Sequence, residues 1–89
     1  GFTNYHMNYQ YAAEKDAAWL VPTKVYDDGN FMYIHLPANA SAPAIYGAKV
    51  GETESLLNTT TEGNVVIIHG IYPNLILRHG SSVVGLRRL

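Results

Sequence analysis

The 89-residue sequence contains no cysteine, which excludes disulfide bonds and any zinc or redox site built from thiolates. Charged residues are also scarce: they make up 15% of the chain, whereas about a quarter is usual. The few lysines and arginines are scattered, apart from Arg87 and Arg88. Nucleic-acid binding requires clustered basic residues that replace phosphate counterions. The composition therefore argues against a nucleic-acid-binding protein.

Long apolar runs are missing as well. No stretch approaches the roughly 18 apolar residues of a membrane-spanning helix, and no basic and apolar leader is present. The chain starts with Gly1 rather than with methionine, which is typical of a fragment cut from a larger protein. We therefore expect a single domain over residues 1–89, with one core and no transmembrane segment.

What the sequence has in abundance is alternation of apolar and polar residues, the period of a half-buried β-strand. The alternation is clearest at residues 4–11, where one face carries Tyr5, Met7, Tyr9 and Tyr11. Further β-rich runs lie at 23–26, 31–36, 44–50, 55–61, 64–69, 74–79 and 82–86. Only residues 12–19 favour a helix, and because Pro22 follows so closely we expect one helical turn at most.

The connections between these runs have the residues of tight turns. Asp28-Gly29 and Glu62-Gly63 each join two runs, and glycine accepts the positive φ that hairpin turns require. About eight short strands, spaced roughly 8–12 residues apart, are typical of a sandwich or a small barrel. We predict an all-β fold, a small antiparallel β-sandwich of about eight short strands.

No group of residues has the pattern of a catalytic or cofactor site. The histidines lie on different predicted strands, without the close spacing of zinc ligands: His6, His35, His69 and His79. Asp27 and Asp28 fall in a turn, where aspartate is favoured because it bonds to the backbone. A nucleophile elbow and a glycine-rich phosphate loop are both missing. We therefore predict that the protein is not an enzyme and binds no metal or cofactor. The alternative, a metal-dependent hydrolase, would require at least three of the four histidines to converge on one metal ion.

The tyrosines are more informative. With seven tyrosines and 47% hydrophobic residues in a weakly charged chain, part of the aromatic surface is expected to contact another molecule. A strand at 4–11 that lies at a sheet edge presents unpaired backbone groups, and nothing in it blunts that edge. In the alternative interpretation, this tyrosine face is packed in the core. The residues that we predict to bind a partner are Tyr5, Met7, Tyr9, Tyr11 and Trp19.

Five runs of residues carry a further signal. The longest is Pro-Thr-Lys-Val-Tyr-Asp-Asp-Gly-Asn-Phe-Met-Tyr-Ile-His-Leu-Pro at 22–37. The others are Asn-Tyr at 4–5, Ala-Pro-Ala-Ile-Tyr at 42–46, Glu-Ser-Leu-Leu-Asn at 54–58 and Leu-Ile-Leu-Arg-His-Gly at 75–80. In this order the runs resemble the TrbG/CagX family, the VirB-type outer-membrane core subunits of bacterial type IV secretion systems. One departure is His69, where the family often has aspartate.

The resemblance implies the C-terminal β-sandwich domain of a larger secretion-core protein, without catalytic activity. It implies binding of a small outer-membrane lipoprotein as an extended segment, contact with a larger core-complex subunit, and assembly into a homo-oligomeric ring. The location that it implies is the periplasm of a Gram-negative bacterium, in association with the outer membrane. The alternative function is a carbohydrate-binding β-sandwich module, in which an exposed tyrosine platform stacks on sugar rings.

Overall fold

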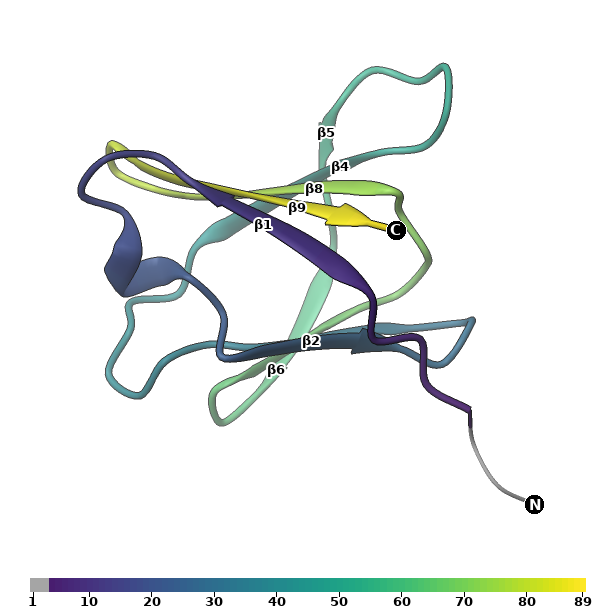
Figure 1. Ribbon diagram of the computed structural model, residues 1–89, viewed down its shortest axis with the longest axis horizontal. Helices are drawn as coiled ribbons and strands as arrows, with labels where there is room; N and C mark the ends of the chain where they lie inside the picture. Colours follow the sequence, from purple (N-terminus) through teal and green to yellow (C-terminus); the bar gives the residue numbers. More distant parts are fainter. Residues whose placement is uncertain (1–3) are drawn as a thin grey trace.

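Extended backbone dominates the structure, a computed structural model that describes residues 4–89. Its strands are β1 (Tyr9–Ala13), β2 (Lys24–Asp27), β3 (Met32–His35), β4 (Ala44–Ala48), β5 (Ser55–Leu56), β6 (Thr59–Glu62), β7 (Val65–Ile68), β8 (Asn74–His79) and β9 (Ser82–Arg88). The helical turn η1 spans Ala18–Leu20, and no helix within residues 4–89 is long and apolar enough to cross a membrane. Two antiparallel sheets, ordered β1-β9-β8-β4-β5 and β2-β3-β7-β6, form the two layers in Figure 1. The predicted all-β sandwich is confirmed.

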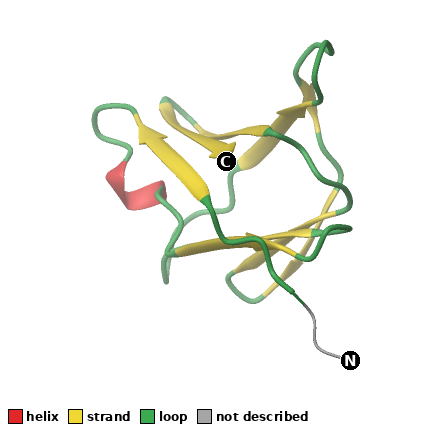
Figure 2. Ribbon diagram, turned by 45° about the vertical axis from the view of Figure 1, so that its right-hand side comes forward, coloured by secondary structure: helices red, strands yellow, loops and turns green. Residues whose placement is uncertain are grey.

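The alternation in the sequence decides which side chains lie between the sheets. In β3, β4 and β8, residues that are buried alternate with residues that are more exposed, because successive side chains of a strand point to opposite faces. The buried hydrophobic residues are Ala17, Leu20, Val25, Met32, Ile34, Leu36, Ile45, Val66, Ile68, Leu75, Leu77, Val84 and Leu86. Figure 2 shows the two layers with η1 at one side between them. The turn η1 therefore contributes Leu20 to the core, and Ala17, the residue before it, is buried as well.

One stretch of chain belongs to both sheets. β5 pairs with β4 in the five-stranded sheet, whereas β6 pairs with β7 in the four-stranded sheet. Leu57 lies at the corner between them, where its N–H donates to the carbonyl of Ile45 at 2.9 Å and its side chain packs against the core. The run at 55–61 is therefore two strands rather than the single strand predicted from the sequence, which makes the total nine.

The first described segment also reaches both sheets. His6 exchanges two backbone hydrogen bonds with Asp27 at the edge of β2, of 2.8 and 3.0 Å. The chain then leaves β2 and crosses to the other sheet, where β1 pairs with β9. Because of this crossing, the strand predicted at 4–11 instead spans Tyr9–Ala13. β1 is the outermost strand of its sheet, so residues 9–13 lie at a sheet edge, the position that partner binding by strand addition requires.

Candidate interaction site

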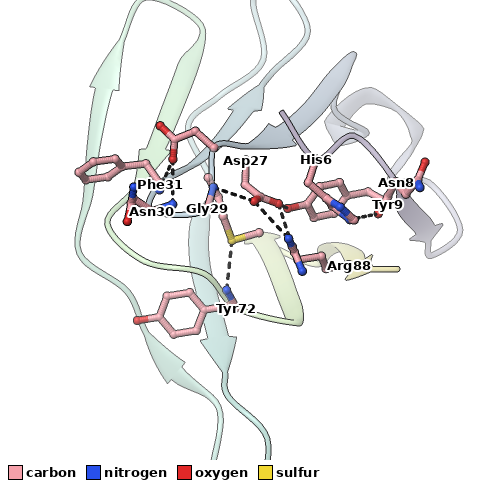
Figure 3. A network of polar contacts seen from close by, with 11 residues as sticks. His6, Asn8, Tyr9, Asp27, Gly29, Asn30, Phe31, Tyr72 and Arg88 are labelled. Carbon is pink, nitrogen blue, oxygen red and sulfur yellow. Dashed lines mark hydrogen bonds and ion pairs between the residues drawn. The ribbon is translucent and has the colours of Figure 1, made fainter. Parts of the chain in front are cut away.

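A buried carboxylate organises the end of the sandwich where the chain crosses between sheets. Among residues 4–89, Asp27 is the one charged side chain without exposed surface. Its Oδ2 accepts hydrogen bonds from the Tyr9 hydroxyl and from Arg88 Nε, the latter at 2.8 Å. Its Oδ1 accepts from Arg88 Nη2 at 3.3 Å and from the Gly29 amide at 3.1 Å. Figure 3 shows these groups converging on Asp27.

This network joins three strands from two sheets. Asp27 ends β2 of the four-stranded sheet, while Tyr9 and Arg88 lie opposite each other in β1 and β9 of the five-stranded sheet. Backbone hydrogen bonds tie the same segment to both sheets: His6 bonds to Asp27 of β2, and the Leu89 N–H donates to the carbonyl of Asn8 at 2.9 Å. The network therefore holds in place the segment that crosses from one sheet to the other, residues 6–9 (the crossing segment). Sequence analysis assigned Asp27 to a turn and did not find its partners.

The surroundings of Asp27 shift two pKa values in opposite directions. Burial by itself would raise the pKa of Asp27, but hydrogen bonds from Arg88, Tyr9 and the Gly29 amide, together with the charge of Arg88, outweigh burial and lower this pKa. Burial, the hydrogen bond to Asp27 and the Asp27 charge raise the pKa of the Tyr9 hydroxyl. Both shifts favour the same arrangement, in which a neutral tyrosine donates to an ionised aspartate.

We expect the stability of the protein to decrease in acid because of Asp27. Its pKa is lower in the folded than in the unfolded chain, so its stabilisation is complete above the unfolded value of about 3.9 and is lost as the pH falls through the folded value. Carbon-13 NMR titration of the Asp27 carboxyl, alongside urea unfolding between neutral pH and pH 2 or so, measures both quantities. Titration of this carboxyl at or above its ordinary pKa would contradict the network.

The structure places the five predicted partner-binding residues in different surroundings. Tyr5 and Met7 are more than half exposed, at 52% and 56%, and with Lys24 and Tyr26 they line a hollow of about 210 Å³ beside β2. Tyr5 packs edge-on against Tyr26, with ring centroids 5.1 Å apart. Tyr9, by contrast, is half-buried and engaged with Asp27.

Tyr11 and Trp19 lie further along the direction of β1. Tyr11 is in β1 and is 41% exposed. Trp19 follows in η1, where its indole N–H donates to Ser82 Oγ at 3.0 Å and its ring packs edge-on against His79. Ser82 begins β9 at the end opposite to Arg88, and Ala13 pairs with Val84 near that end. Trp19 is therefore beyond the C-terminal end of β1.

A trough crosses the outer face of the five-stranded sheet next to Tyr11. It encloses about 520 Å³, and its floor follows a row of directly opposed residues, Ala12, Gly85 and Ile76. Because alanine and glycine occupy positions 12 and 85, Ile76 is accessible from the side of β1. Arg87 stands at the rim, and the ion pairs of the described chain involve Arg78 and Arg88 rather than Arg87. The trough is apolar with one unpaired positive charge.

The four histidines have separate surroundings. His6 Nε2 lies 3.2 Å from the Asn8 carbonyl, His35 Nε2 lies 3.0 Å from the Tyr26 hydroxyl, and His69 Nε2 lies 2.8 Å from Thr60 Oγ1. His79 packs against Trp19. Within residues 4–89, no three histidine, aspartate or glutamate side chains come together in a way that could hold a metal ion.

Comparison with known proteins identifies relatives along almost the whole chain. The sequence model of the CagX family, described as a conjugal transfer protein, matches residues 3–89. Type IV secretion system protein virB9 of Bartonella quintana is 34% identical over 85 residues, which are 91% of this chain and 29% of the relative. The protein of the same name from Brucella abortus is 29% identical over 82 residues, which are 89% of this chain and 28% of the relative.

A third relative has a different name and comes from a third organism. Type IV secretion system protein PtlF of Bordetella pertussis is 31% identical over 65 residues, which are 73% of this chain and 24% of the relative. The chain thus spans between 24% and 29% of the length of these three curated relatives. None of the three is described as a carbohydrate-binding protein, so the carbohydrate-binding alternative gains no support.

Proposed function

The chain belongs to the CagX family of conjugal transfer proteins, and from this membership we propose that it is a structural, non-catalytic domain of a bacterial type IV secretion system. Its role is that of the C-terminal domain, residues 1–89, of an outer-membrane core subunit in the periplasm. The domain binds a small outer-membrane lipoprotein as an extended segment and contacts a larger core subunit. Copies of the whole subunit form a homo-oligomeric ring, and the function requires no metal or cofactor.

The open edge of β1 is the observation that supports lipoprotein binding. β1 pairs with β9 on one side only. The Glu14 N–H donates to Val83, and Asn8 accepts from Leu89, so the even-numbered residues bond to β9. In an antiparallel ladder the odd-numbered residues of β1 then direct their N–H and C=O groups away from β9. Tyr11 and Ala13 therefore offer backbone groups to an added strand.

The side chains around this edge are suited to an extended partner. A strand beside β1 places every second side chain on the outer face, where the trough leads across Ala12 and Gly85 to Ile76. Arg87 at its rim favours an acidic residue in the partner. Of the predicted residues, Tyr11 lies in β1 itself, Trp19 lies in η1 beyond the end of β1, and Tyr5 and Met7 precede β1 and lie beside β2. In this proposal Tyr9 acts indirectly, because it holds the segment through Asp27.

Titration of labelled protein with peptides from candidate lipoproteins tests the proposal. We expect NMR shifts along residues 9–13 and new protection of the Tyr11 and Ala13 amides from hydrogen exchange. The variant Ala13→Pro removes one outward N–H with little change of side-chain volume, and it should weaken binding about tenfold or more.

Thr61→Pro, in the open edge of β6, is the matched control, because it makes the same change at the edge strand of the other sheet. It should leave peptide binding unchanged. The absence of a response to every peptide from a matched secretion system would remove the proposed lipoprotein binding. Protection that appears at β6 instead of β1 would move the binding site to the other sheet.

A further inference from the structure

The segment that contains β1 contributes almost nothing to the core. No residue from 4 to 16 is buried, and Ala17 is the first buried residue of the described chain. Within that segment, Tyr9 is the hydrophobic residue that packs against the core cluster. The remaining strands of both sheets therefore enclose the core without β1, which is held mainly by backbone pairing with β9 and by the Asp27 network.

The connection that follows β1 is tight. Between β1 and Ala17 the chain turns within three residues, and the Ala17 N–H donates to the Glu14 carbonyl at 3.0 Å. Asp16 has a φ of 68°, in the left-handed region that glycine adopts freely and other residues adopt at a cost. An extended connection would release Asp16 from this conformation. Short connections under strain favour exchange of the preceding element between two molecules.

We infer that β1 can be exchanged between two copies of this chain, so that β1 of one copy pairs with β9 of its partner copy. Every contact of β1 can form again in such a dimer, because each copy supplies the same strand and the same β9 edge. Tyr9 of one copy then donates to the Asp27 carboxylate of the other. Only the connection at residues 14–16 differs, and it becomes extended.

This exchange is separate from lipoprotein binding. The exchange uses the side of β1 that faces β9, where Gln10 and Ala12 form the ladder. Lipoprotein binding uses the opposite side, through Tyr11 and Ala13. Either inference can therefore fail while the other holds.

Cysteine cross-linking tests the exchange, and the chain has no native cysteine that would interfere. Ala12 and Gly85 are directly opposed in β1 and β9, and a Cβ at Gly85 meets only the Ala12 carbonyl oxygen, at an ordinary 3.7 Å. Proteins carrying Ala12→Cys or Gly85→Cys alone are mixed, unfolded, refolded together at high concentration and oxidised. We expect a covalent heterodimer.

Two controls make the result decisive. Ser55→Cys is exposed like Ala12→Cys but lies in β5, at the far edge of the same sheet, so its yield with Gly85→Cys measures random collision. The double variant Ala12→Cys/Gly85→Cys should form an internal disulfide in the monomer. If it does, and the mixture cross-links no more than the Ser55→Cys control, the exchange is overturned. Failure of the internal disulfide would contradict the pairing on which the exchange depends.

Variants of Asp16 supply a second readout. Asp16→Gly removes the strain at this position and should lower the dimer fraction measured by light scattering after size-exclusion chromatography. Asp16→Ala tolerates the left-handed conformation less well than aspartate and should raise that fraction. Equal dimer fractions for the two variants would show that the connection does not control the exchange.

Discussion

Replacement of Asp27 by alanine is expected to lower the free energy of unfolding by about 3–5 kcal/mol, the usual effect of removing one partner from a buried ion pair. The substitution leaves the Arg88 guanidinium, the Tyr9 hydroxyl and the Gly29 amide without their acceptor. It also removes the side-chain link between the two sheets. A chain of 89 residues has a total stability of roughly 4–13 kcal/mol, so this loss is a large fraction of it.

Urea unfolding of Asp27→Ala and Asp28→Ala provides the measurement and its control. Asp28 is the next residue in the same turn, but its carboxylate bonds to the backbone of Asn30 and Phe31 within the turn. We expect the smaller loss for Asp28→Ala. If Asp27→Ala does not fold, Asp27→Asn gives a milder test, because the amide keeps the shape of the side chain and an oxygen that can accept from the Tyr9 hydroxyl. Equal losses for the two aspartates would show that Asp27 acts only in the turn.

The second large effect is expected at Gly47, in β4. A Cβ at this position would lie 2.7 Å from Leu57 Cδ1 and 3.1 Å from both Leu75 Cδ2 and Tyr72 Cδ1. Overfilling a packed site of this kind typically costs about 1–3 kcal/mol, and we expect that loss for Gly47→Ala. Gly47→Val should lose more. The crowded residues include Leu57, so the corner between β5 and β6 should loosen as well.

Gly85 supplies the matched control for Gly47. Both glycines lie in strands of the five-stranded sheet, but the neighbour of a Cβ at Gly85 is a single backbone oxygen at 3.7 Å. Gly85→Ala should therefore change the free energy of unfolding by no more than about 0.5 kcal/mol. Thermal or urea unfolding of the two variants measures the difference. Similar losses would mean that a general effect of glycine in strands, rather than crowding at the corner, determines both.

Local pattern was sufficient to predict most of the strands. Alternation at 31–36, 44–50 and 74–79 reflects which face of each strand is buried, and this depends on neighbours in sequence. The division of 55–61 could not be predicted in this way. No glycine or proline divides this run, and only the pairing of β5 with β4 and of β6 with β7 shows that the chain changes sheets.

The Asp27 network shows what sequence reasoning missed and why. Val25 and Asp27 are two residues apart in β2 and share its inward face, but the predicted strand ended at residue 26 and Asp27 was assigned to the turn. Because Asp28-Gly29 is typical of a turn, both aspartates were interpreted as turn residues. Asp28 does have this role, since its carboxylate accepts from the Asn30 amide. The partners of Asp27 lie 18 and 61 residues away, in Tyr9 and Arg88. Spacing in the sequence carries no signal for contacts of that range.

The position of the Asp27 network has a mechanical consequence. Tyr9 begins β1 and Arg88 ends β9, and the two residues are paired, so tension applied through the chain on either side of them pulls at one end of the same ladder. In this geometry the hydrogen bonds between the strands break one after another from the loaded end, which requires little force. The Asp27 carboxylate accepts hydrogen bonds from both residues at the end where this separation would start. Asp27 is therefore expected to resist the separation of β1 from β9 when the domain is pulled from that end of the ladder.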